Sequence, residues 1–219
     1  MNPHELRDFV YGQIARIGKA VSSPKRLEIL DLLSQGEKTV EALAERSEMS
    51  IKLTSAHLRE LRAAQIVETR KEGKYVVYRL ANEGIVELWV KLRGLAEAQY
   101  HELTSTLVQH GGASEESTRF TAAQVSEKAK RGDAFLIDVR PHDEYLAGHL
   151  PFAQSFPLEE LKKRLTELPK NREIIAYCKG SHCLQANEAV KILRKRGFKA
   201  SRLKEGVSDL RADGVALEK

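Results

Sequence analysis

The stretch from residue 50 to residue 80 reads SIKLTSAHLRELRAAQIVETRKEGKYVVYRL. Ser50 is a residue type that caps helix N-termini, and the positions after it follow a helical period through about residue 63. One face of this predicted helix carries Thr54, Leu58 and Leu61, which can pack into a domain. A second face, at positions i, i+3, i+7 and i+10, carries Lys52, Ser55, Arg59 and Arg62.

A hairpin is predicted directly after this helix. Two alternating segments, 66–70 and 75–80, flank the turn Lys71-Glu72-Gly73-Lys74. Upstream, Thr39 is placed to cap a short helix through about Arg46, and a tight turn at 47–49 leads to Ser50. Two helices joined by a tight turn and followed by a basic hairpin predict a helix-turn-helix with a wing.

The rest of the first half also has helical spacing. Apolar residues recur at 6, 10, 14 and 17, and Ser23-Pro24 is typical of a helix start. A long last helix is predicted from about 82 to 109. We therefore expect the N-terminal half to be a mainly α-helical winged helix-turn-helix domain.

The basic face has the residue types that contact DNA. A helix fits the major groove, where arginine and serine reach base edges or phosphates, and a basic wing can neutralise phosphates nearby. The candidate DNA-binding residues are Lys52, Ser55, Ala56, Arg59, Arg62, Arg70, Lys71 and Lys74. The alternative is an ordinary amphipathic helix with a solvated basic face, and the net charge of +5 alone does not separate the two.

Three segments resemble the ArsR family of winged-helix repressors: 22–30 (SSPKRLEIL), 55–61 (SAHLREL) and 70–80 (RKEGKYVVYRL). The resemblance covers about residues 5–105. It implies a homodimer built from the first and last helices, which reads palindromic double-stranded operator DNA with the helix at 50–63. Many relatives sense metals or reactive sulfur through cysteines in this domain, but this half contains none. His101, Glu102 and His110 form an incomplete set of ligands, so we expect no metal site.

A linker is predicted where adjacent glycines precede small and polar residues, from Gly111 to Thr118. This assigns residues 1–110 to the DNA-binding and dimerisation domain and 119–219 to a second domain. In the second domain strands at 134–139, 173–177 and 199–203 alternate with helices at 141–146, 158–168 and up to about 196, and Thr121 with Gln124 forms a capping box. The alternation predicts an α/β domain with a parallel sheet.

The two cysteines of the chain enclose one loop, Cys178-Lys179-Gly180-Ser181-His182-Cys183, between a buried strand and a helix. Loop amides and a helix N-terminus favour an anion there, and Lys179 and His182 add positive charge. Such surroundings lower the pKa of a thiol and make it reactive. Cys178 is therefore the candidate nucleophile; the alternatives are a pair of inert packing cysteines and, less favoured, a zinc site with His182 and His149.

Residues 136–140 (LIDVR), 144–145 (EY), 148–151 (GHLP), 156–157 (FP) and the cysteine loop resemble a single-domain rhodanese over about 119–217. The resemblance implies a persulfide on Cys178, and the six-residue loop is typical of sulfur-transferring members rather than of related phosphatases and arsenate reductases. Cys183 stands where many rhodaneses have arginine, and Phe152 and Leu210 replace a usual glycine and tryptophan. Cys183 is the candidate resolving thiol. Asp138 and Arg140 are expected to be a structural pair.

These features together predict a sulfur-responsive transcriptional regulator that binds operator DNA as a homodimer and carries a persulfide on Cys178. The alternative is a sulfurtransferase enzyme whose winged-helix half serves for dimerisation or localisation. The expected sulfur donor is thiosulfate or a low-molecular-weight persulfide, and no cofactor is expected. The polar N-terminus lacks a secretion signal and no apolar run is long enough to cross a membrane, so we expect a cytoplasmic protein without a membrane partner.

Overall fold

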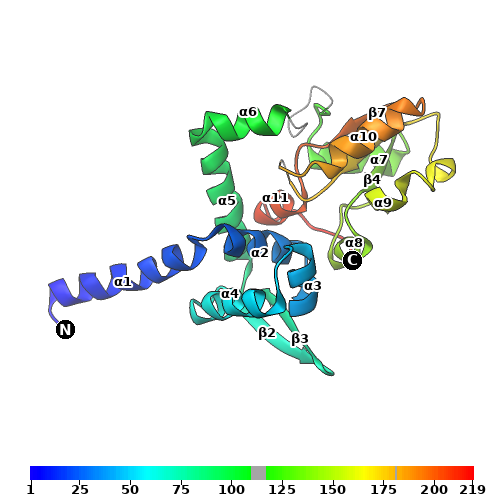
Figure 1. The fold of residues 1–219 in the computed structure, drawn as a ribbon. Coiled ribbons are helices and arrows are strands. Elements are labelled where there is room, and N and C mark those ends of the chain that lie inside the picture. Colours follow the sequence, from blue (N-terminus) through cyan, green and yellow to red (C-terminus); the bar gives the residue numbers. More distant parts are fainter. Residues whose placement is uncertain (110–116, 181) are drawn as a thin grey trace. The chain divides into compact units, whose positions relative to one another are not determined.

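The computed structural model describes residues 1–109, 117–180 and 182–219, which divide into two compact units, Met1–Trp89 and Val90–Lys219 (Figure 1). The units divide within α5 (Glu83–Gln99), whereas the sequence placed its boundary at the glycine pair. That pair, Gly111 and Gly112, lies outside the described residues. At the end of the predicted linker, Ser117 forms a β-bridge with Arg202, and the Thr118 N–H donates to the Arg202 carbonyl at 2.7 Å.

The first unit has the predicted winged helix-turn-helix arrangement. Its helices are α1 (Pro3–Val21), α2 (Pro24–Ser34), α3 (Val40–Arg46), α4 (Ile51–Ala63) and the start of α5. Its strands β1 (Lys38–Thr39), β2 (Val67–Glu72) and β3 (Tyr75–Leu80) form an antiparallel sheet in the order β1-β3-β2. The predicted hairpin is confirmed as β2 and β3, while β1 was not predicted.

Local capping explains why α3 and α4 begin where they do. The Thr39 hydroxyl accepts the Ala42 N–H at 3.3 Å, and the Ser50 hydroxyl accepts the Leu53 N–H at 3.2 Å. The turn between the helices contains Glu48 in the left-handed region, at φ 52°. The predicted inner face of α4 is buried, since Thr54, Leu58 and Leu61 are all inaccessible to solvent.

The long helix predicted over 82–109 is wrong, because the chain breaks at Tyr100 into α5 and α6 (His101–Gln109). The Thr104 hydroxyl donates to the Glu97 carbonyl at 2.8 Å and so takes an acceptor near the end of α5. Threonine side chains that bond to the backbone compete with helix continuation. Helical spacing alone carried no sign of this competition.

The second unit is an α/β domain with a four-stranded parallel sheet in the order β5-β4-β6-β7. Its strands are β4 (Ala134–Asp138), β5 (Gln154–Ser155), β6 (Glu173–Tyr177) and β7 (Ala200–Arg202). Its remaining helices are α7 (Ala122–Arg131), α8 (His142–Ala147), α9 (Leu158–Leu161), α10 (Gln185–Lys195) and α11 (Val207–Ala212). The three predicted strands are confirmed; β5 and α11 were not predicted.

The helix predicted over 158–168 is shorter than expected. It consists of α9 and a separate 3-10 turn, Leu165–Glu167. Leu168 is extended, at φ −88° and ψ 137°, and it precedes Pro169. Proline disfavours the helical conformation of the residue before it, so the helix cannot continue to 168.

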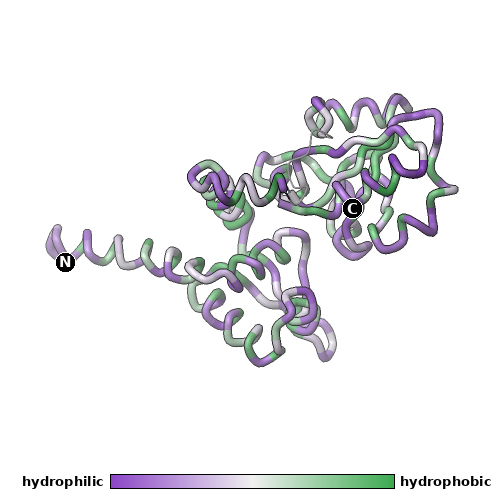
Figure 2. Tube along the Cα trace, turned by 45° about the horizontal axis from the view of Figure 1, so that its top comes forward, coloured by the Kyte–Doolittle hydropathy of each residue, from purple (hydrophilic) through white to green (hydrophobic). Residues whose placement is uncertain are grey.

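Helices cover both faces of the sheet, and the strands are apolar on both sides for this reason. Along β6, Ile174 and Ala176 belong to the core beneath α9 and α10, while Ile175 and Tyr177 belong to the core beneath α7 and α11. In Figure 2, apolar segments of the second unit lie among segments of mixed or hydrophilic character. The carboxyl end of β6 leads directly into the cysteine loop.

A buried ion pair fixes the neighbouring strand end. Arg140 and Asp138 are both inaccessible to solvent; the Arg140 Nη2 donates to Asp138 Oδ2 at 2.6 Å and to the Gly148 carbonyl at 2.7 Å. Burial lowers the pKa of Arg140, but the Asp138 charge outweighs it and the pKa is raised above its usual value. Burial, and then Asp138, raise the pKa of the adjacent Tyr177 well above its usual value. Arg140 thus serves the fold, as predicted.

Phe152 has the left-handed backbone conformation, at φ 66°. Glycine adopts this conformation without steric cost, whereas a side chain with a Cβ is strained there. The backbone at Phe152 therefore suits glycine, the residue that the resemblance described above leads us to expect at this position. No helix in the described part of the chain is long and apolar enough to span a membrane.

Candidate functional site

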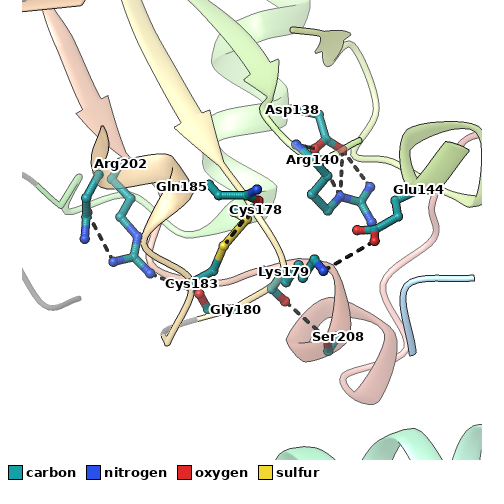
Figure 3. The surroundings of a disulfide bond; sticks show 12 residues. Asp138, Arg140, Glu144, Cys178, Lys179, Gly180, Cys183, Gln185, Arg202 and Ser208 are labelled. Carbon is teal, nitrogen blue, oxygen red and sulfur yellow. Dashed lines mark hydrogen bonds and ion pairs between the residues drawn. A yellow bond between two sulfur atoms is a disulfide. The ribbon is translucent and has the colours of Figure 1, made fainter. Parts of the chain in front are cut away.

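The cysteine loop joins β6 to α10, and its two cysteines form a disulfide bond (Figure 3). Their Cα atoms lie 6.4 Å apart. Cys178 is 3% exposed and Cys183 is 9% exposed. The two sulfur atoms that sequence analysis singled out are therefore brought together, at the carboxyl edge of the parallel sheet.

Three successive carbonyls of the loop are held from one segment, Arg202–Ser208. The Val207 N–H donates to the Cys178 carbonyl at 3.2 Å. The Ser208 N–H and hydroxyl both donate to the Lys179 carbonyl, at 3.3 and 3.2 Å. The Arg202 Nη2 donates to the Gly180 carbonyl at 3.0 Å. We call this segment the loop clamp, because it fixes the backbone that carries Cys178.

Gly206 lets the loop clamp approach the loop closely. A Cβ at this position would overlap the backbone nitrogen of Gly180 and the carbonyl group of Lys179. The backbone of Gly206 is extended, at φ −110°, so its lack of a side chain serves the close approach rather than an unusual conformation. No local sequence signal marks Gly206, because the residues that it contacts are distant along the chain.

The positive charges around the loop have partners in the protein. Lys179 Nζ forms an ion pair with Glu144 Oε1 at 3.3 Å, and Glu144 is fully buried. Arg202 is buried, and its Nη1 donates to Asn187 Oδ1 at 3.2 Å. Burial lowers the pKa of Arg202, an effect that the Asp209 charge opposes. The positive charge that Lys179 brings to the loop is therefore shared with the Glu144 carboxylate.

Gln185, the first residue of α10, lies beside both sulfur atoms. Its Oε1 is 3.2 Å from the Sγ of Cys178 and 3.7 Å from the Sγ of Cys183. Gln185 is not among the predicted site residues, although its place two residues after Cys183, at the start of a helix, is a local sequence signal. Of the other predicted loop residues, Gly180 is buried, His182 is half-buried, and Ser181 lies outside the described residues.

The predicted DNA-reading face of α4 is solvent-accessible. Lys52, Arg59 and Arg62 are exposed, and Ser55 and Ala56 are half-buried between them and the core. On the wing, Lys71 and Lys74 are exposed. The arrangement offers cationic side chains on a helix and on a neighbouring hairpin, which is the chemistry that phosphate binding requires.

Arg70 differs from the other wing cations because two carboxylates hold it. Its Nε donates to Glu37 Oε2 at 2.8 Å, and its Nη1 is 2.7 Å from Glu72 Oε2. These hydrogen bonds raise the pKa of Arg70 further above its usual value. Arg70 is thus held between Glu37, just before β1, and Glu72, at the end of β2, and it shares its charge with both carboxylates.

No group of three or more histidine, cysteine, aspartate or glutamate side chains within residues 1–109, 117–180 and 182–219 could hold a metal ion. Cys178 and Cys183 are bonded to each other, and a disulfide sulfur is not a thiolate ligand. His110, one of the three side chains considered on the terminal helix, lies outside the described residues.

Two family models match separate parts of the chain. "Bacterial regulatory protein, arsR family" matches residues 23–69, and "Rhodanese-like domain" matches residues 121–213. The first segment contains α4, and the second contains the cysteine loop and the loop clamp.

Known proteins resemble the chain both over its length and in part. It is 38% identical over 206 residues to the HTH-type transcriptional regulator Rv0324 of Mycobacterium tuberculosis, covering 94% of this chain and 90% of that protein. It is 41% identical over 73 residues to the arsenical resistance operon repressor of Staphylococcus xylosus, covering 33% of this chain and 70% of the repressor. The solution structure of the homodimeric winged helix-turn-helix DNA-binding domain Mb0332 of Mycobacterium bovis is 40% identical, covers 43% of this chain and 89% of that domain, and has a TM-score of 0.42. Because the similarity to the mycobacterial regulator spans nearly the whole of both proteins, and both family segments are present, the chain belongs to the ArsR family of transcriptional regulators and carries a C-terminal rhodanese-like domain.

Proposed function

We propose that this regulator binds operator DNA as a homodimer and changes its operator affinity when a persulfide reacts at Cys178. The observation that carries the proposal is the pairing of the only two cysteines in the chain, in one loop of the rhodanese-like domain. The reading half contains no cysteine, so a thiol-based signal must begin in this loop. We further propose the division into residues 1–110, a linker at 111–118 and a second domain at 119–219.

The proposed reaction has two balanced steps. The Cys178 thiolate attacks the outer sulfur of a low-molecular-weight persulfide, which gives a persulfide on Cys178 and releases the donor as a thiol. The Cys183 thiolate then attacks the Sγ of Cys178 and expels the outer sulfur as hydrosulfide. Two thiols are oxidised to one disulfide, and the persulfide sulfur is reduced. The Cys178–Cys183 bond supports this end state.

Two features of the first unit support DNA binding by a dimer. The exposed basic side chains of α4 and the wing can contact the phosphates and base edges of a DNA duplex. An α-helix such as α4 fits into the major groove. The helix α1 also exposes apolar side chains that a second copy would cover, namely Leu6, Phe9, Val10, Tyr11 and Ile14. Figure 2 shows hydrophilic and apolar segments in alternation along this N-terminal helix.

The test of the sulfur response is operator affinity before and after treatment with glutathione persulfide. The operator is a duplex that the reduced protein selects from a random pool. We expect the wild type to change its affinity by about 5-fold or more, because allosteric couplings are typically about 1–3 kcal/mol. Cys178→Ser should show no change, and Cys183→Ser should hold the persulfide without forming the disulfide.

Mass spectrometry distinguishes these species by one added sulfur or two lost hydrogens. Equal operator affinity in the reduced and treated wild type would contradict the sensor proposal. In that case steady-state turnover of the persulfide, or of thiosulfate with cyanide, would favour the alternative of a sulfurtransferase tethered to a winged-helix half.

The DNA-reading face gives a separate prediction. Lys52→Ala and Arg59→Ala should each weaken binding to the selected duplex by about 1–3 kcal/mol if the side chain contacts a base edge. Lys71→Ala should weaken binding to all duplexes alike, because a phosphate contact carries no sequence information. Arg70→Ala should have a smaller effect than Lys71→Ala, since Glu37 and Glu72 already hold Arg70.

Fluorescence anisotropy with the selected and a scrambled duplex measures these changes. A scrambled duplex that responds to Arg59→Ala as strongly as the selected one would assign Arg59 to the phosphates. Unchanged affinity in the Lys52→Ala, Arg59→Ala double variant would show that α4 is not the reading helix.

A further inference from the structure

The Gln185 side chain touches both sulfur atoms of the loop, and Figure 3 shows it alongside the disulfide. Gln185 begins α10, two residues after Cys183, so the helix itself sets its position. The contact to Cys178, at 3.2 Å, is the closer of the two.

A glutamine amide is suited to a sulfur that changes its protonation state. Its oxygen accepts a hydrogen bond from a thiol, and its nitrogen donates two hydrogen bonds. In the reduced protein the Cys178 thiol can donate to Oε1. Once the sulfur is a thiolate or a persulfide anion, a half-turn of the amide places Nε2 where Oε1 was. One side chain can therefore serve both states.

The cations near the loop are already engaged, which leaves this task to a neutral donor. Lys179 is paired with Glu144, and Arg202 donates to the Gly180 carbonyl and to Asn187. Arg93 and Asp209 also lie near Gly180 within the second unit. Among the described residues, the charged and titratable side chains near the loop include Arg93, Glu144, Lys179, His182, Arg202 and Asp209.

We propose that Gln185 is a further catalytic residue of this site: its amide donates a hydrogen bond to the Cys178 thiolate and then to the Cys178 persulfide. The inference rests on the proposed sulfur chemistry at Cys178. It adds a direct contact to the reacting atom by a residue outside the cysteine loop. A hydrogen bond to the charged form lowers the pKa of a thiol, so Gln185 increases the fraction of reactive thiolate.

The experiment measures the pH profile of Cys178 alkylation in the full chain. A Cys183→Ser background leaves Cys178 as the single thiol. We expect Gln185→Leu to raise the pKa of Cys178 by about one unit, so that alkylation below that pKa is about tenfold slower. Gln185→Glu should raise the pKa further, because a carboxylate repels the thiolate.

Two further variants separate chemistry from structure. Gln185→Lys should lower the pKa of Cys178 again, since an ammonium group at this position attracts the thiolate and donates hydrogen bonds to it; a pKa unchanged from Gln185→Leu would show that position 185 does not reach the sulfur. Gln154→Leu, at an exposed glutamine of β5, is the matched control and should leave the profile unchanged.

The same samples are then treated with glutathione persulfide and analysed by mass spectrometry. If Gln185→Leu has the parent pH profile, or if Gln185→Lys behaves like Gln185→Leu, the role of Gln185 is overturned. If the pH profile of the Cys183→Ser protein depends on Gln185 but Cys178 gains no sulfur from the donor, the proposed function is contradicted. The hydrogen bond from Gln185 to the Cys178 thiolate is then still supported.

Discussion

Asp138→Asn is expected to lower the free energy of unfolding of the second unit by about 3–5 kcal/mol. Arg140 and Asp138 are both fully buried, and the Arg140 Nε and Nη2 donate to the two carboxylate oxygens. Removing the negative charge leaves the buried guanidinium without its counter-charge. Urea unfolding of the reduced protein, followed by circular dichroism, measures the change.

The chain supplies two controls for this measurement. Glu127→Gln removes one partner of an exposed ion pair with Arg131 on α7, and such pairs contribute less than about 1 kcal/mol. Trp89 is the only tryptophan and belongs to the first unit, where its Nε1 donates to Asp31. Its fluorescence transition should therefore stay in place. A loss in Asp138→Asn no larger than in Glu127→Gln would mean that the pair contributes little.

Gly206→Ala is expected to slow persulfide formation at Cys178 by about 10²-fold, because a misplacement of about 1 Å at a reacting group has costs of this size. The added Cβ overlaps the backbone of Lys179 and Gly180, so the loop or the loop clamp must move. Overpacking of this kind also lowers stability by about 1–3 kcal/mol. The rate is measured by quenching with an alkylating reagent and mass spectrometry.

Gly94→Ala is the matched control, since a Cβ there meets no atom within 4 Å and alanine favours the helix. It should react at the wild-type rate. Wild-type reactivity in Gly206→Ala itself would show that the contact between loop clamp and loop does not position Cys178.

Most of the fold could be predicted from local signals. These signals lie within short windows of sequence: the caps at Thr39, Ser50 and Thr121, the helical spacing, and the apolar runs of β4 and β6. The break at Tyr100 was missed because a threonine hydroxyl competes with the helix there. The leucine spacing over 158–168 predicts one helix, whereas α9 ends at Leu161 and a separate 3-10 turn follows. Pro169 accounts only for the extended Leu168.

For the candidate site, the sequence predicted the cysteine loop but not the residues that hold it. The cysteine loop lies between two recognisable elements, so its place at the sheet edge followed from the alternation. The partners of the loop come from distant positions: Glu144 precedes it on α8, and Arg202 and Gly206 follow it around β7. Only the folded sheet brings them together. Sequence could count the charge of Lys179 but could not show that Glu144 shares it.

Hydrogen exchange at the loop clamp reports on the motion of the cysteine loop. The amide protons of Val207 and Ser208 are bonded to the carbonyls of Cys178 and Lys179, so they exchange with deuterium only when these bonds open. Their protection factors therefore measure how often the loop leaves its place. Two backbone sites without any sulfur atom become reporters of motion at the sulfur, in oxidised and reduced protein alike.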